Sequence, residues 1–294
     1  MRDVSNWMLT GHGERSTLKM LTLQSPDGYN YYIKFPRQFD GKRPNLEDIN
    51  EVIAAKIAEL LGIKSVSAEI AHFQGSRVCL MRDFIEENDS AQGEHAGSLF
   101  EVEFEEKYTY ISQSDLKDDE LIKYIFSLVR RFSHYKIIRK DFIDMNLFDL
   151  LIGNQDRHPY NWQILYDSSG NPSVGPLYDN GASLAWQLPD SSLEIYIKQK
   201  SKMESYFNKM KVKAGLDEKE SPRIRGTLLL AYLKNSFSND FEDFLIRLKK
   251  FNMDEFYDFI QQLPELSDIR IEFLMRFIEV RREILLRREV LNDE

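Results

Sequence analysis

Cysteine is nearly absent from this sequence, and so are long hydrophobic runs. The 294 residues include a single cysteine, Cys79, which cannot form a disulfide within the chain and lies in the apolar run 78–81. We expect it to be a buried structural thiol. No apolar stretch approaches the roughly 20 residues that span a bilayer, and residues 1–10 lack the apolar core of a secretory signal. We therefore predict a cytoplasmic protein without a membrane segment, while an exported effector with an unrecognised signal stays open.

A surplus of basic residues is also lacking, because 39 lysines and arginines stand against 48 aspartates and glutamates, for a net charge of −9. A protein that binds a nucleic-acid duplex usually carries a basic surplus or stripe, so we predict no direct nucleic-acid partner. The five histidines form no metal-ligand spacing with the cysteine, which argues against a zinc site. Composition is otherwise that of a soluble globular protein, at 42% hydrophobic and 30% charged residues.

The N-terminal part of the chain, residues 1–85, is predicted to be mostly β-sheet. Residues 18–35 are typical of a β-hairpin, because two β-rich segments flank a Ser-Pro-Asp-Gly turn. Residues 46–61 place apolar side chains at helical spacing and stop at a glycine, which predicts one amphipathic helix. Two more short strands are expected at 66–73 and 77–84.

Helical patterns dominate the rest of the chain. Residues 86–97 are acidic, small and polar, which suits a surface connection between two lobes. A short β segment is expected at 162–178, and residues 209–221 are charged and weakly patterned, which predicts an exposed loop. Helices are expected at 117–134, 140–152, 223–236, 240–250, 253–262 and 268–289. The pattern predicts an α+β protein with a β-rich N-lobe at 1–85 and a helical C-lobe at 86–294.

The polar loop after the helix at 140–152 carries the most informative pattern. Asp156 and Asn161 stand five residues apart in it, and Asp179 begins an Asp-x-Gly sequence 23 residues after Asp156. In a phosphoryl-transfer site one carboxylate orients the attacking hydroxyl, while an amide and a second carboxylate hold the magnesium that bridges the nucleotide phosphates. We therefore predict a kinase that uses ATP and Mg²⁺, with Asp156 as the catalytic residue and Asn161 and Asp179 as metal ligands. An ordinary polar turn is the alternative.

Lys34 is the predicted phosphate-binding lysine. Strand alternation puts Tyr32 and Lys34 on one face of the hairpin, from which the lysine can point into a cleft between lobes. A carboxylate from the following helix would fix its position, and we expect Glu51 to be that partner, with Glu47 as the rival. The alternative is that Lys34 is a solvated lysine on the strand surface and Glu51 a solvated glutamate on the helix surface.

A glycine-containing segment precedes the hairpin. Gly11, Gly13, Ser16 and Thr17 lie in it, and small residues with hydroxyl groups let backbone amides approach phosphate closely. The segment lacks the G-x-x-x-x-G-K-[ST] pattern of P-loop NTPases. We predict a phosphate loop from its position directly before the strand of Lys34.

The motifs together resemble the HipA-like serine/threonine kinases. Residues 147–158 with Asn161, then residues 176–179, carry the resemblance, and looser similarity extends over residues 11–290. The resemblance implies a two-lobed kinase fold, the roles given above for the motif residues, and an adenine-contacting hinge at residues 82–84. Met81, Asp83 and Phe84 are the expected nucleotide contacts there. His158 is expected to shape the catalytic loop by hydrogen bonding.

The resemblance also implies partners. Such kinases are bacterial toxins or regulators, often encoded beside a helix-turn-helix antitoxin, and their targets include aminoacyl-tRNA synthetases and other translation factors. Members autophosphorylate a serine in the glycine-rich loop, for which Ser16, then Thr17, is the candidate here. The chain resembles short members in which an N-terminal subdomain is absent or supplied as a separate small protein. Its metal motif reads Asp179-Asn180-Gly181, without the phenylalanine that many kinases have there.

Two other functions remain possible at this point. A phosphoinositide-type lipid kinase shares the loop chemistry, but the segment 182–190 has no basic residue for an anionic headgroup. A nucleotide-binding pseudokinase that acts as a scaffold would be expected to have lost one of the motif residues, and all of them are present.

Overall fold

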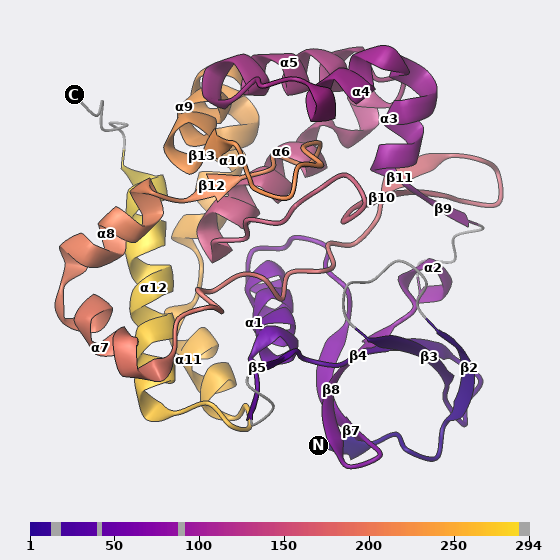
Figure 1. Ribbon diagram of the computed structural model, residues 1–294, viewed down its shortest axis with the longest axis vertical. Coiled ribbons are helices and arrows are strands. Elements are labelled where there is room, and N and C mark those ends of the chain that lie inside the picture. The colour runs from indigo at the N-terminus through magenta and orange to yellow at the C-terminus, as the bar shows by residue number, and fades with distance from the viewer. Residues whose placement is uncertain (13–18, 40–42, 88–91, 288–294) are drawn as a thin grey trace.

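The computed structural model describes residues 1–12, 19–39, 43–87 and 92–287, folded into two lobes (Figure 1). A twisted sheet forms one lobe, at the lower right of Figure 1, and helices form the other, above it and to the left. The predicted phosphate-loop residues Gly13, Ser16 and Thr17 lie outside the described residues. Within the described residues, no helix combines the length and the apolar character that crossing a membrane requires.

The N-lobe is built on a six-stranded sheet with the order β1-β7-β8-β4-β3-β2. Its strands are β1 (Arg2–Asp3), β2 (Met8–His12), β3 (Met20–Gln24), β4 (Asn30–Lys34), β7 (Ala68–Phe73) and β8 (Ser76–Arg82). Strands β3 and β4 form the predicted hairpin, whose turn places Gly28 at a φ of 85°. One face of the sheet buries Leu21, Leu23 and Ile33 in a small apolar core of its own, as the strand alternation predicted.

Helix α1 (Glu47–Leu60) covers the other face of this sheet and joins it to the main core. Its apolar side chains Ile49, Ile53 and Ile57 are fully buried, as the helical spacing of residues 46–61 predicted. The helix also contacts the C-lobe, because the Lys56 ammonium lies 2.8 Å from a Glu255 carboxylate oxygen. The position of α1 is therefore fixed from both lobes. A two-stranded pair of β5 (Gln38–Phe39) and β6 (Arg43–Pro44) precedes it.

The expected surface connection at 86–97 is only partly a connection. Helix α2 (Phe84–Glu87) begins before it, and β9 (Gln92–His95) pairs with β10 (Gln163–Tyr166), which also pairs with β11 (Pro172–Val174). The connecting segment thus adds a strand to the C-lobe sheet that follows the catalytic loop. The strand was not predicted because its sequence is polar, and its residues are alternately exposed and half-buried. The boundary between lobes at residue 85 stays a prediction.

The C-lobe surrounds α6 (Tyr135–Ile152), whose residues from Phe142 onward are all buried. The other expected helices are present as α5 (Asp118–Arg131), α9 (Gly226–Ser236), α10 (Ser238–Lys249), α11 (Met253–Gln261) and α12 (Asp268–Leu286). Besides α2, four short helices were not predicted from the sequence: α3 (Ala96–Phe104), α4 (Glu106–Gln113), α7 (Asp190–Lys198) and α8 (Lys200–Asn208). Each has only eight or nine residues, so few apolar positions repeat.

The prediction of an exposed loop at 209–221 was wrong. Strand β12 (Lys211–Val212) pairs with β13 (Ile224–Arg225), and residues 212–217 are buried. Met210, Val212, Ala214 and Leu216 alternate with charged or small residues and enter the main core. The period-2 spacing of these apolar residues is that of a strand, and the charged residues of the segment led to the prediction of an exposed loop.

Candidate active site

A cleft of about 340 Å³ collects most of the predicted site residues from both lobes. Those lining it are Lys34, Glu51, Met81, Asp83, Phe84, Asp156, His158, Asn161 and Asp179. Gly11 is different: it lies in the edge strand β2, paired with Thr22, and is not among the lining residues. The sequence therefore identified the cleft, although the predicted phosphate loop is not placed by the described part of the chain.

A buried arginine, Arg157, organises the catalytic loop. Helix α6 ends at Gly153, whose φ of 73° turns the chain out of the helix. The Arg157 guanidinium then donates two hydrogen bonds to the Asp149 carboxylate, each of 3.0 Å, and both side chains are almost fully buried. It also donates to the carbonyl of Asn161 at 2.7 Å. A bidentate pair of this kind fixes the loop geometrically.

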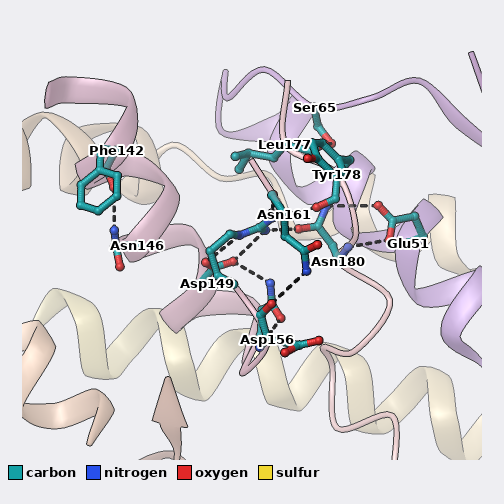
Figure 2. A network of polar contacts seen from close by, with 12 residues as sticks. Glu51, Ser65, Phe142, Asn146, Asp149, Asp156, Asn161, Leu177, Tyr178 and Asn180 are labelled. Atoms are coloured by element: carbon teal, nitrogen blue, oxygen red, sulfur yellow. Dashed lines mark hydrogen bonds and ion pairs between the residues drawn. The ribbon is translucent and has the colours of Figure 1, made fainter. Parts of the chain in front are cut away.

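The same arginine reaches the metal motif. Arg157 donates to the Tyr178 carbonyl at 2.7 Å and to the side-chain oxygen of Asn180. The backbone amide of Asn180 donates in turn to a Glu51 carboxylate oxygen at 2.6 Å, as Figure 2 shows. A continuous network thus runs from the catalytic loop through the metal motif to α1 of the N-lobe.

The third position of the metal motif, Gly181, leaves no room for a side chain. A Cβ atom at Gly181 would lie 2.7 Å from the Glu47 carbonyl oxygen, closer than real Cβ contacts. The chain therefore passes against the start of α1 only because this residue has no side chain. The same approach brings Asp179 into the cleft, at a φ of 59°.

Lys34 and Asp179 form an ion pair across the cleft, with 2.8 Å between Nζ and Oδ1. Burial disfavours the charged form of both groups, but the charge of each group stabilises the charged form of the other. The Asp179 and Glu51 carboxylates raise the pKa of Lys34 above its ordinary value. Burial also acts against ionisation of Asp179, yet the Lys34 ammonium outweighs it and lowers the pKa of that carboxyl. Both groups are therefore charged at neutral pH.

Glu51 does not take the expected place beside the Lys34 ammonium. It accepts two hydrogen bonds from Asn180, one from the backbone amide and one from the side chain, and contributes to Lys34 only through its field. Glu47, the rival, lies beside Arg37 instead, with 3.6 Å between the charged groups. Glu51 was expected to pair with a charged side chain, but its carboxylate binds the backbone amide of the metal motif instead.

Asp156 lies at the mouth of the cleft with its side chain half exposed. Its backbone amide donates to the Asn154 side chain at 3.0 Å, which fixes the start of the loop. Its Oδ1 accepts a hydrogen bond of 2.7 Å from Nζ of Lys213, a residue that sequence analysis did not consider. The one available signal was a lysine within the alternating apolar segment 210–216.

Asn161 presents its amide oxygen to the same space. Its Nδ2 donates to the Asp156 carbonyl at 2.9 Å, so the amide is held with its oxygen at the other end. Asp179 keeps a second carboxylate oxygen beyond the one paired with Lys34, and its side chain is half exposed. Carboxylate and amide oxygens are the ligands that Mg²⁺ prefers. The donor set therefore fits a magnesium ion.

His158 behaves as a residue that shapes the loop. Its Nδ1 accepts a hydrogen bond of 3.2 Å from the Tyr160 backbone amide. Burial lowers the pKa of the imidazole below its ordinary value, against the opposing field of Asp156. A neutral ring that already accepts a backbone hydrogen bond suits the structural part that sequence analysis gave it.

The apolar end of the cleft is suited to a flat ring. Phe84 and Tyr178 stack with 5.5 Å between ring centroids and 22° between planes. The Tyr32 hydroxyl donates to an Asp83 carboxylate oxygen at 3.2 Å, and burial together with that carboxylate raises the pKa of Tyr32 to about 12. Met81 and Phe84 line the cleft here. Tyr178 also lines the cleft, a position that was not expected for it although it stands beside Asp179 in the metal motif.

The comparison with known protein families decides the family. A family model described as the HipA-like C-terminal domain matches residues 8–232. The chain belongs to this family. The resemblance noted in the motif residues is thereby confirmed, and so is the prediction of a kinase.

Similar proteins agree with this assignment. The serine/threonine-protein kinase CtkA of Helicobacter pylori is 23% identical over 259 residues, which cover 86% of this chain and 76% of that protein. The serine/threonine-protein kinase toxin HipA of Shewanella oneidensis is 26% identical over 145 residues, covering 45% of this chain and 33% of that protein. Both relatives are named as kinases, and this chain is a HipA-like kinase.

Solved structures confirm the fold. The crystal structure of the Helicobacter pylori kinase CtkA superposes with a TM-score of 0.74 at 21% identity, covering 96% of this chain and 94% of that one. The Shewanella oneidensis HipA, solved with HipB and its operator DNA, superposes with a TM-score of 0.55 at 14% identity, covering 96% and 67%. The two-lobed kinase-like architecture predicted from the sequence is therefore correct.

Proposed function

We propose that this HipA-like kinase transfers the γ-phosphoryl group of ATP to a serine or threonine hydroxyl of a protein, with Mg²⁺ as the metal. One observation carries the proposal. Lys34 of β4, Asp156 and Asn161 of the catalytic loop and Asp179 of the metal motif line a single cleft, although they come from separate segments. Phosphoryl transfer needs this set: a cation for phosphates, a carboxylate for the hydroxyl and oxygen ligands for the metal.

Each side chain has a part in the proposed reaction. Asp156 accepts a hydrogen bond from the acceptor hydroxyl and takes its proton as the new O–P bond forms and the bond from the γ-phosphorus to the β-phosphate oxygen breaks, so that ADP leaves. Lys34 would bind nucleotide phosphates, while its partner Asp179 would offer its second carboxylate oxygen to the metal. Asn161 and Asp179 would hold Mg²⁺, which when bound neutralises charge on the phosphates. The stacked Phe84 and Tyr178 rings bound the adenine end.

The test is transfer from labelled ATP by the full chain. Purified wild type is incubated with γ-labelled ATP and Mg²⁺ in a cell lysate, and Asp156→Ala is assayed beside it. We expect labelled protein with the wild type and a loss of about 10³-fold in the variant, the range for removal of a general base. Asp115→Ala is the matched control, because this carboxylate is fully exposed and lies outside the cleft lining.

The same assay separates the alternatives. With lipid vesicles added to the reaction, label in lipid but not in protein would replace the proposal by a lipid kinase. Nucleotide binding without transfer to protein or lipid would replace it by a pseudokinase scaffold. Equal transfer by wild type and Asp156→Ala would remove Asp156 from its role.

We also propose a regulatory setting for this activity: a translation-related target, such as an aminoacyl-tRNA synthetase, and an antitoxin-type partner. Support comes from the Shewanella oneidensis relative, which is named a toxin and was solved with HipB. Phosphoproteomics of cells expressing wild type or Asp156→Ala would identify the target. Autophosphorylation at Ser16 or Thr17 belongs to the same experiment. Growth arrest by wild type alone, relieved by a neighbouring gene product, is the expected result.

A further inference from the structure

Lys213 is a buried charge beside the cleft that the proposed mechanism does not use. Its side chain is only 6% exposed, yet its Nζ lies 2.7 Å from Oδ1 of Asp156, whose side chain is 48% exposed. Ordering and burying a lysine side chain costs conformational entropy and desolvation. A lysine placed in this way is held there by the surrounding structure.

The turn that carries Lys213 is pinned directly to the catalytic loop. Gly215 donates its amide to the Arg157 carbonyl at 3.0 Å, and the Trp162 indole donates to the Gly215 carbonyl at 2.8 Å. The turn is tight, because Gly215 has a φ of 81° and a Cβ there would lie 2.8 Å from the Phe142 ring. Two hydrogen bonds thus tie Gly215, two residues after Lys213, to Arg157 within the predicted catalytic motif and to Trp162 directly after it.

A second anchor holds the far end of the turn. The Asp217 amide donates to the Lys213 carbonyl at 3.0 Å, and the fully buried Asp217 carboxylate accepts two hydrogen bonds from Arg223. Arg223 donates further to the carbonyls of Ile111 and Ser114 in and after α4. The Lys213 backbone is therefore fixed between the catalytic loop and the helical wall of the C-lobe.

We propose that Lys213 is a positioning residue for the reaction: it holds one oxygen of Asp156 so that the other faces the acceptor hydroxyl. This inference rests on the proposed kinase function and deepens it. A half-exposed carboxylate would otherwise rotate among several hydrated orientations. A charge-assisted hydrogen bond to one oxygen selects a single orientation, and a fixed geometry at the reacting atoms is worth far more than the hydrogen bond itself. The proton of the acceptor hydroxyl still goes to Asp156, and Lys213 keeps all of its protons.

The first test compares two lysines of the same segment. Lys213→Met removes the ammonium and keeps a side chain of similar length in an apolar surrounding. Lys211→Met is the matched control, because Lys211 is exposed on the same strand β12. We expect kcat of Lys213→Met to fall about 10²-fold, the effect of a misplaced catalytic group, with KM for ATP within twofold of wild type. Lys211→Met should equal wild type in both parameters.

A double-mutant cycle tests whether Lys213 acts through Asp156. In the Asp156→Ala background, Lys213→Met should lower the remaining rate less than threefold, because the carboxylate that it positions is gone. Independent effects that multiply would overturn the positioning role. So would full activity of Lys213→Met in a protein whose Asp156→Ala variant is inactive.

Folding is controlled in the same series. Melting and nucleotide binding are measured for Lys213→Met and for Lys213→Gln, whose amide can still donate to Asp156. The glutamine variant should retain more activity than the methionine variant. Lower melting temperatures with lost ATP binding in both would overturn the proposal in favour of a purely structural lysine. Absence of transfer by the wild type would overturn the kinase proposal and this inference with it.

Discussion

The ion pair under the catalytic loop and the two ion pairs of the cleft differ in which partner is exposed to solvent. In the floor of the catalytic loop, the Arg157 and Asp149 side chains are 1% and 3% exposed. In the cleft above it, Lys34 and Lys213 are 13% and 6% exposed, whereas their carboxylate partners Asp179 and Asp156 are 40% and 48% exposed. In the floor both partners are buried, whereas in the cleft only the cation is buried and the carboxylate is exposed to solvent.

This difference separates a structural pair from a functional one. A fully buried pair makes all of its hydrogen bonds within the protein and offers nothing to a ligand. A buried lysine beside an open carboxylate fixes the carboxylate and leaves its second oxygen for a metal or a hydroxyl. Removing a partner should therefore cost stability in the floor and activity in the cleft.

The largest effect on stability is expected from Arg157→Met. This change leaves the Asp149 carboxylate buried without its cation, which typically costs about 3–5 kcal/mol of folding free energy. Urea unfolding followed by circular dichroism measures it. Arg225→Met is the control, because its pair with Asp118 is far more exposed, and it should change stability by less than about 1 kcal/mol. Equal midpoints for the two variants would contradict the distinction between floor and surface.

Asp179→Asn should act mainly on catalysis. The amide keeps the shape of the side chain but loses the charge that would bind the metal, so we expect kcat/KM to fall about 10²- to 10³-fold. Because the side chain is half exposed, the loss of stability should stay under about 2 kcal/mol. The Mg²⁺ concentration that gives half-maximal transfer should rise, because the variant has lost one charged metal ligand. A variant with wild-type rates at low Mg²⁺ would exclude Asp179 as a ligand.

A smaller effect is expected where an ion pair joins the lobes at the surface. Lys56 contacts Glu59 and Glu255, and both carboxylates are largely exposed. Lys56→Met should lower the free energy of unfolding by no more than about 1 kcal/mol, as exposed pairs do. Thermal melting would detect it. A loss as large as that of Arg157→Met would mean that the contact between α1 and α11 dominates the stability of the N-lobe.

The smallest effect concerns the cysteine. Burial raises the pKa of the Cys79 thiol well above its ordinary value, and the reactive form of a thiol is the thiolate. Since the raised pKa keeps the group protonated at pH 8, iodoacetamide should leave the native protein unmodified and label it only in urea. Mass spectrometry provides the measurement. Rapid labelling of the native chain would show that the cleft wall at β8 opens.

Elements that follow from a local sequence pattern were predicted correctly. The helix at 46–61 and the strands before and after it follow from the spacing of apolar residues, and the structure confirms them. Asp156, Asn161 and Asp179 were predicted as one site because the chemistry of phosphate and metal restricts which side chains can stand at that spacing, and the structure places all three in one cleft. The strand alternation that placed Lys34 in the cleft is equally local.

Contacts between residues that only the fold brings together were not predicted. Lys213 is 57 residues from Asp156, and nothing in the intervening sequence relates the two. The partner of Glu51 is a backbone amide, which every residue possesses and no sequence pattern reveals. Segment 209–221 was assigned by its charge, although its alternation already indicated burial.

The central claim is that Asp156, Asn161, Asp179 and Lys34 meet around one metal-bound nucleotide. A crystal structure of the full chain with a non-hydrolysable ATP analogue and Mn²⁺, which gives an anomalous signal, tests it most directly. The account predicts an anomalous peak between Asn161 and Asp179, adenine beside Phe84 and Tyr178, and the γ-phosphate facing Asp156. A metal bound by other side chains, or a nucleotide outside this cleft, would contradict it.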